Sequence, residues 1–160
     1  PKKDQLKCFE MQINASQSID KPIVIHSRDA DKDMKDIIVS NYKLSKFRGV
    51  LHCFTGSKEL ARAALDIGFY ISFSGILTFK NSTLLQEIAS YIPSDRFLIE
   101  TDSPYLSPVP FRGKTNEPKN TFYIAEYISK LRGGSFNAIA QQSRDNTLKL
   151  FNNLRTNLWK

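Results

Sequence analysis

Short apolar runs alternate with longer amphipathic stretches along this chain. The apolar runs are rich in β-branched and aromatic residues, as is typical of buried strands, and they lie at 23–25, 50–51, 69–73 and 97–101. Helical spacing of apolar residues predicts helices at about 4–19, 57–67, 82–91, 121–131 and 135–151, and one more that buries Met34, Ile37 and Ile38. Strict alternation of strand and helix predicts parallel strands joined by right-handed crossovers.

Several residues predict where the helices begin and end. Pro22 stops the first helix, because proline cannot continue a helix and restricts the residue before it. Ser57 and Ser135 are expected N-caps, and either Asp29 or Asp31 is expected to cap the helix between the first two strands. These signals support the order helix, then four strand–helix units, then a last helix.

Polar side chains stand at the ends of three predicted strands. His26 follows the first apolar run, His52 follows the second and Asp102 follows the last. Because side chains alternate across a strand, Glu100 shares a face with Asp102, whereas Cys53 points away from His52. The C-terminal ends of parallel strands are where active sites form in α/β proteins. We therefore expect His26, His52 and Asp102 to converge.

Imidazole and carboxylate together suit a catalytic divalent metal with open positions. In that interpretation Asp102 is a metal ligand, the base that takes a proton from water, or both, and Glu100 orients a ligand from behind. Each residue also has a structural interpretation. A histidine at a strand end often makes only structural hydrogen bonds, and Asp-Ser-Pro is common in turns. The spacing leaves both interpretations open.

Composition narrows the class of protein. The chain has 160 residues, 41% of them hydrophobic and 24% charged, which fits one globular domain. No apolar run approaches the ~20 residues that cross a bilayer, and the first residues lack a signal-peptide core, so a cytoplasmic protein is expected. The two cysteines fit a reducing compartment, with Cys53 buried and Cys8 at or near the core. The net charge of +7 fits either a polyanionic partner such as nucleic acid or a basic solvated surface.

Basic and aromatic residues gather in the predicted loops beyond the strand ends. Arg28 and Arg112 are candidate phosphate-binding residues, because guanidinium groups make bidentate contacts with phosphate. Phe111 and Tyr105 either stack on bases or pack the long loop onto the fold. Glu117 is available for an ion pair that anchors Arg112.

Five segments in order resemble the TatD family of metal-dependent deoxyribonucleases, which are amidohydrolase-like TIM-barrel hydrolases. They are PIVIHSRDA, GVLHCFTGS, GFYISFSGILTFKN, IETDSPYLSPVPFRGKTNEP and QSRDNTLKLF. The sequence IETDSPYL followed by RGKxNEP is the most specific of these features. The resemblance covers nearly the whole chain.

This resemblance implies hydrolysis of DNA phosphodiester bonds at a one- or two-metal site, with water as the nucleophile. By match of motif, His26 and His52 are implied metal ligands, and Asp102 is an implied metal ligand or catalytic carboxylate. The implied cofactor is a divalent metal ion: Zn²⁺ fits the histidines, and Mg²⁺ or Mn²⁺ fits the phosphodiester chemistry. The implied partner is DNA.

The chain also departs from the family pattern. Family members open with His-x-His on the first barrel strand and carry a bridging glutamate before the segment that matches PIVIHSRDA, and this sequence has neither. We therefore expect residues 1–160 to form a single partial TatD-type domain, the C-terminal half of a TIM (β/α)8 barrel with about four βα units.

Four strands would leave two open sheet edges, so a complementary N-terminal half or a homodimer is expected. Two functional alternatives follow from the missing ligands. One is a half-barrel that binds nucleic acid without cleaving it, and the other is a decayed reading-frame product without an independent role.

Overall fold

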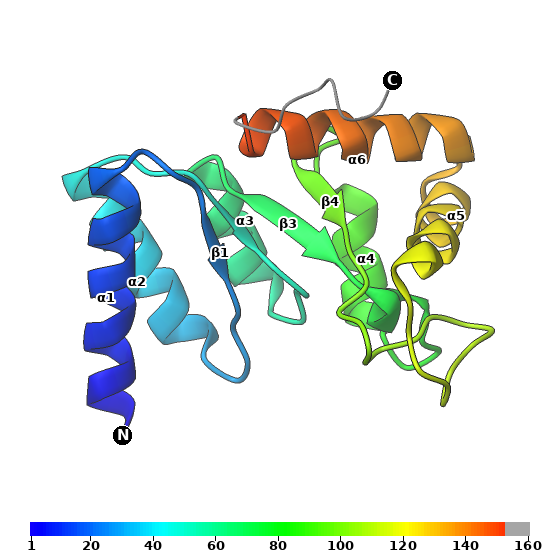
Figure 1. Cartoon of the computed structure of the whole chain (residues 1–160), viewed down its shortest axis with the longest axis horizontal. Coiled ribbons are helices and arrows are strands. Elements are labelled where there is room, and N and C mark those ends of the chain that lie inside the picture. Colours follow the sequence, from blue (N-terminus) through cyan, green and yellow to red (C-terminus); the bar gives the residue numbers. More distant parts are fainter. Residues whose placement is uncertain (153–160) are drawn as a thin grey trace.

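The computed structural model describes residues 1–152 as one α/β unit built on a parallel sheet (Figure 1). The sheet has the order β1-β2-β3-β4, and all neighbouring strands are parallel. The strands are β1 (Ile23–Ile25), β2 (Gly49–Leu51), β3 (Tyr70–Phe73) and β4 (Phe97–Ile99). The predicted α/β class and the predicted parallel strands are thus confirmed. The C-terminal half of a barrel stays a prediction.

The helices follow the predicted order with small shifts at their ends. They are α1 (Lys2–Ser18), α2 (Asp31–Leu44), α3 (Lys58–Asp66), α4 (Thr83–Tyr91), α5 (Thr121–Arg132) and α6 (Phe136–Leu150). Two short 3-10 helices, η1 (Gly75–Thr78) and η2 (Pro118–Asn120), were not predicted. Among residues 1–152, no helix combines the length and the apolar character needed to cross a membrane.

Side-chain hydroxyls begin two of the helices as predicted. Ser57 Oγ accepts a hydrogen bond from Leu60 N, and Ser135 Oγ accepts one from Ala138 N. The predicted aspartate cap of α2 is wrong, because its N-cap is Ala30 and no side chain caps it. Asp31 instead accepts a 2.6 Å hydrogen bond from Ser57 N, so it ties the start of α2 to the start of α3.

The main core lies between the sheet and the helices. It contains alternate residues of the strands, including Leu51, Ile71 and Phe97. These side chains pack with residues of α2 to α5 such as Ile38 and Ile128. The opposite side of the sheet, called the inner face below, carries the other set: Val24, Val50, Tyr70, Ser72 and Leu98.

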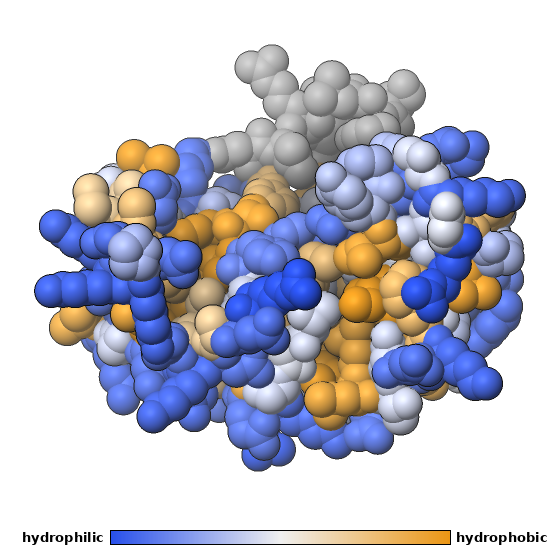
Figure 2. Space-filling view, turned by 90° about the horizontal axis from the view of Figure 1, so that it is seen from below, coloured by the Kyte–Doolittle hydropathy of each residue, from blue (hydrophilic) through white to orange (hydrophobic). Residues whose placement is uncertain are grey.

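The inner face is covered unevenly. Leu150 at the end of α6 packs against Val50, Tyr70 and Leu98 and buries them. Val24 of β1 is 56% exposed, so the prediction of a wholly buried first strand is wrong. Seen from the side to which the strands run (Figure 2), hydrophobic surface is visible between hydrophilic flanks.

Candidate metal centre

A chain of hydrogen bonds crosses the inner face at the C-terminal ends of three strands. His52 follows β2, and its Nδ1 lies 2.8 Å from Oε1 of Glu100, which follows β4. Ser72 of β3 donates a 2.6 Å hydrogen bond to Oε2 of the same carboxylate. The alternation of side chains puts all three residues on the inner face, since they stand two positions after Val50, Leu98 and Tyr70.

His26 and Asp102 complete the group. Nδ1 of His26, just after β1, lies 3.3 Å from Nε2 of His52. One ligand atom from each of His52, Glu100 and Asp102 lies within 4.8 Å of the others. Asp102 has φ of +57°, a left-handed backbone conformation that turns the chain sharply where β4 ends. The structure thus brings His52, Glu100 and Asp102 together, and His26 lies beside His52.

The pairing with Glu100 determines which nitrogen of His52 is free. When Nδ1 donates to the carboxylate, Nε2 keeps its lone pair and points toward His26. A carboxylate behind a histidine is the arrangement that orients metal-binding imidazoles in many proteins. Imidazole nitrogen and carboxylate oxygen are also the donors that catalytic zinc and manganese sites use. The side chains present therefore fit a divalent cation.

Both oxygens of Glu100 have partners, one from His52 and one from Ser72. A carboxylate engaged in this way is better suited to orient His52 than to bind a cation directly. The orienting role of Glu100 stays a prediction. The ligand roles of His26, His52 and Asp102 stay predictions.

Asn116 is a site residue whose role the sequence did not reveal. It is 3% exposed, and its Nδ2 donates 2.7 Å hydrogen bonds to the backbone carbonyls of Thr101 and Tyr105, on the two sides of Asp102. Its Oδ1 accepts from the backbone N of Glu117 and from Nδ2 of Asn120. All four hydrogen-bonding positions of the amide are therefore used to hold the Asp102 turn against the start of α5. The Asn-Glu-Pro sequence suggested only a helix start.

The long segment between β4 and α5 is also held against η1. A side chain at Gly75 would meet the carbonyl oxygen of Leu106 at 1.8 Å, so only glycine permits this approach. Thr78 Oγ1 accepts a 2.9 Å hydrogen bond from Val109 N. These contacts and those of Asn116 fix the segment at two places.

The two predicted phosphate-binding arginines lie in different surroundings. Arg28 is exposed, 3.8 Å from Asp29, and lines a cleft of about 610 Å³ that also includes His26. Arg112 stacks over the ring of Phe79 at 4.0 Å. The predicted ion pair between Glu117 and Arg112 is wrong, because Glu117 pairs with Lys119 at 2.7 Å. The path of the loop gives Arg112 an aromatic neighbour instead.

The two cysteines also differ. Cys53 is buried and hydrogen-bonded to Ser74, as expected of a structural thiol. Burial, with smaller contributions from the charges of Asp102 and Glu100, raises the pKa of the Cys53 thiol to about 11. Cys8 is exposed on α1, so its predicted place near the core is wrong.

Comparison with known proteins agrees with this geometry. The family described as TatD related DNase matches residues 1–152. The chain is 46% identical over 147 residues to an uncharacterized metal-dependent hydrolase of Escherichia coli, YcfH, covering 92% of this chain and 55% of that protein. It is 44% identical over 151 residues to an uncharacterized metal-dependent hydrolase of Bacillus subtilis, YabD, covering 94% and 59%. The chain thus spans about half the length of the curated relatives it matches.

A solved structure shows the same arrangement of elements. The crystal structure of YJJV, a TatD homolog from Escherichia coli, superposes with a TM-score of 0.79 at 26% identity and covers 88% of this chain and 54% of that one. The family match and the identity to the two hydrolases point in the same direction as the strand-end residues. This chain belongs to the TatD related DNase family.

Proposed function

We propose that this chain carries part of the active site of a metal-dependent hydrolase that cleaves DNA phosphodiester bonds with water. The observation that carries the proposal is the hydrogen-bonded series His26, His52, Glu100 and Ser72, beside Asp102. Nδ1 of His26 lies 3.3 Å from Nε2 of His52, and ligand atoms of His52, Glu100 and Asp102 lie within 4.8 Å of one another. The family description and the metal-dependent relatives support this chemistry.

The residues have separate roles in this proposal. His26, His52 and Asp102 would hold the divalent cation, which would activate water and stabilise negative charge on a phosphoryl oxygen. Glu100 keeps His52 in the tautomer that exposes Nε2, and Ser72 keeps Glu100 in place. Asp102 accepts the proton of the attacking water in this proposal.

Arg28 and Arg112 bind the DNA backbone in this proposal. Arg28 lines the same cleft as His26, which supports a role in binding a phosphate there. The stacking of Arg112 on Phe79 orients a planar cation while its N–H groups stay available for phosphate oxygens.

A nuclease assay on single-stranded DNA tests the proposal. With Mg²⁺ or Mn²⁺ we expect cleavage, which a chelator abolishes and added cation restores. His52→Ala should lower the cleavage rate by about 100-fold or more, because it removes a ligand and the partner of Glu100. Glu87→Gln, which alters an exposed carboxylate paired with Lys58 on the outside, is the matched control. Activity that survives both the chelator and His52→Ala would exclude this mechanism.

A second candidate function is nucleic-acid binding without cleavage. It is favoured by the net charge of +7 in a chain that spans about half of its relatives. In this case binding to single-stranded DNA should persist without cleavage and should weaken steeply with added salt, because lysine and arginine would neutralise phosphates.

We also propose that the inner face is completed by a partner, either a complementary N-terminal half or a second copy of this chain. The exposed Val24 supports this, since parallel sheets are normally covered on both faces. Within residues 1–152, β1 and β4 each have a strand neighbour on one side. Light scattering should show a dimer or a larger assembly, and a stable soluble monomer would contradict the proposal.

A further inference from the structure

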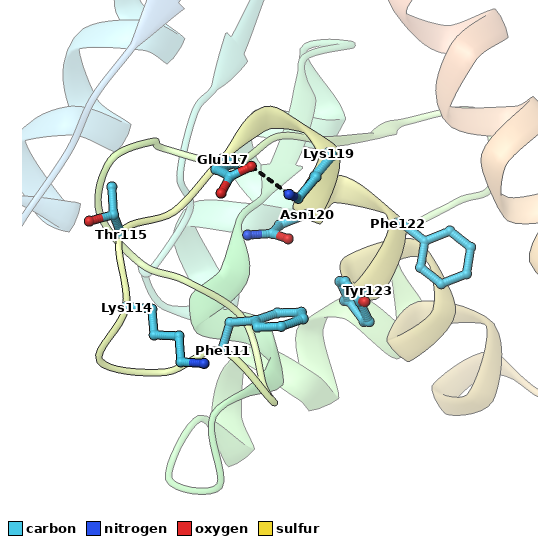
Figure 3. A pocket seen from close by; sticks show the side chains of 8 residues that line it. All are labelled: Phe111, Lys114, Thr115, Glu117, Lys119, Asn120, Phe122 and Tyr123. Atoms are coloured by element: carbon cyan, nitrogen blue, oxygen red, sulfur yellow. Dashed lines mark ion pairs between the residues drawn. The ribbon is translucent and has the colours of Figure 1, made fainter.

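A pocket lies between the long β4–α5 segment and the start of α5 (Figure 3). Its volume is about 710 Å³, within the range of small-ligand sites. The residues that matter for its chemistry are Phe111, Phe122, Tyr123, Lys114, Lys119 and Glu117. The proposed hydrolytic reaction uses none of them.

One side of the pocket is aromatic. The rings of Phe111 and Tyr123 meet edge to face, with centroids 4.9 Å apart. In such a pair one ring presents its edge to a face of the other, so each ring keeps at least one face outside this contact. Phe122 extends the aromatic surface, packs on Phe136 and is 50% exposed. These rings offer a flat ligand a place to stack.

Charged side chains also line the pocket. Lys114 has no ion-pair partner within the part of the chain that the structure describes. Lys119 forms an ion pair with Glu117 at 2.7 Å, so the three side chains carry a net positive charge. A ligand that combines a flat ring with negative charge matches both sides, and a nucleotide is such a ligand.

The pocket has a fixed relation to the candidate metal centre. Thr115 and Glu117 belong to its wall, and Asn116 stands between them in the sequence. The amide of Asn116 binds the backbone carbonyls of Thr101 and Tyr105, which lie on the two sides of Asp102. The wall of the pocket and the Asp102 turn are therefore parts of one hydrogen-bonded unit.

We propose that this pocket binds one nucleotide of a single-stranded DNA, at a distance along the strand from the phosphate that is cleaved. Its base stacks on Phe111, and Lys114 contacts its phosphate. The inference rests on the proposed function, because it assumes that the strand in the pocket also reaches the candidate metal centre. It adds a base-binding subsite to a site otherwise built for phosphate.

Binding of a fluorescent oligothymidylate in EDTA tests the subsite without cleavage. Phe111→Leu should weaken binding about 5- to 100-fold, the range that loss of one stacked base produces. Lys114→Gln should lower the slope of log affinity against log salt by about one. Tyr91→Leu, an exposed aromatic on α4 outside the pocket, should bind like the wild type.

An oligomer that keeps the phosphates but lacks the bases separates stacking from charge. The wild type should bind it more weakly than the oligothymidylate, whereas Phe111→Leu should bind the two oligomers nearly equally. The proposal is overturned if the wild type and Phe111→Leu prefer the oligothymidylate over the base-free oligomer to the same degree. So does unchanged oligothymidylate binding by Phe111→Leu. If Phe111→Leu fails to fold, two other variants decide the outcome. Phe111→Tyr should retain oligothymidylate binding, and Lys114→Gln should lower the salt slope of that binding by about one.

The two hypotheses fail differently. If DNA is not cleaved but binding in EDTA depends on Phe111, the proposed hydrolysis is wrong and the subsite stands. If DNA is cleaved and Phe111→Leu binds and discriminates like the wild type, the subsite is wrong and the hydrolysis stands.

Discussion

The two outer strands of the sheet, β1 and β4, differ in how far their side chains on the inner face are buried. On β4, Leu98 lies under Leu150 of α6 and is 6% exposed. Asn146 of α6 also donates 2.9 Å hydrogen bonds to the carbonyls of Ser94 and Phe97. On β1, Val24 occupies the same face and is 56% exposed.

This difference divides the candidate metal centre. His52, Glu100 and Ser72 stand on the three strands that α6 covers or adjoins, and they hold one another by hydrogen bonds. His26 stands on the open strand, where its contact with His52 is its one hydrogen bond within the described residues. The site thus has a preorganised part and a part whose position depends on β1.

The largest expected difference concerns stability. Leu98→Ala should lower the free energy of unfolding by about 2–5 kcal/mol, because it opens a cavity under α6. Val24→Ala should change it by no more than about 0.5 kcal/mol, because water already surrounds this side chain. Urea denaturation of both variants measures the contrast. Equal losses would mean that Val24 is also covered in solution.

The next effect concerns cation affinity on the covered side. Glu100→Gln should weaken Mn²⁺ binding about 10- to 100-fold, because an amide can leave His52 in the wrong tautomer. Titration calorimetry measures the affinity, and circular dichroism shows whether the fold is intact. Glu87→Gln is again the control. An unchanged affinity would show that Glu100 does not orient His52.

A smaller effect should come from the residue that connects the two sides. Arg48, just before β2, donates hydrogen bonds to the carbonyls of Leu150 at the end of α6 and of Asp20 before β1. Arg48→Gln should lower the free energy of unfolding by about 1 kcal/mol, because these partly exposed bonds are lost. The exposed Arg62→Gln on α3 should leave it nearly unchanged. A loss as large as that of Leu98→Ala would mean that the covered side at β4 and the open side at β1 unfold together when the Arg48 hydrogen bonds are lost.

Thiol labelling gives the smallest signal and needs no variant. Cys8 on α1 is exposed, so it should react with a disulfide reagent within minutes at a pH of about 8. Cys53 should stay unmodified until the protein unfolds, because it is buried and burial raises its pKa to about 11. A raised pKa stabilises the protonated thiol in the folded state. This contribution is complete below the ordinary value of 9.0 and is lost as the pH rises toward 11. Rapid labelling of both thiols would contradict the burial of Cys53.

Local rules account for the part of the site that the sequence predicted. Alternation along a strand depends on neighbouring residues, so the sequence could indicate the face of each polar residue relative to its own strand. The caps by Ser57 and Ser135 were predicted for the same reason. Which ion pair Glu117 forms depends on the path of a long loop, and no local pattern encodes this path.

Coverage of a face is a tertiary property. The β-branched run at β1 predicts a strand, but the exposure of Val24 depends on where α6 lies, more than 100 residues later in the chain. The role of Asn116 also depends on contacts with Thr101 and Tyr105 across the loop. Sequence patterns therefore predicted which polar residues stand at the strand ends, but they predicted neither the hydrogen bonds that hold the Asp102 turn nor the exposure of β1.

The hydrogen bonds of Asn116 have a consequence for the order in which the protein forms during synthesis. A nascent chain that has reached Phe111 already contains all four strands, His52 and Glu100. It still lacks the amide that bridges the carbonyls on either side of Asp102, and this amide is itself held by Asn120. The Asp102 turn is therefore secured only after translation has passed the start of α5. A premature stop in the long loop would release a product that contains all four strands but lacks the amide that holds the Asp102 turn.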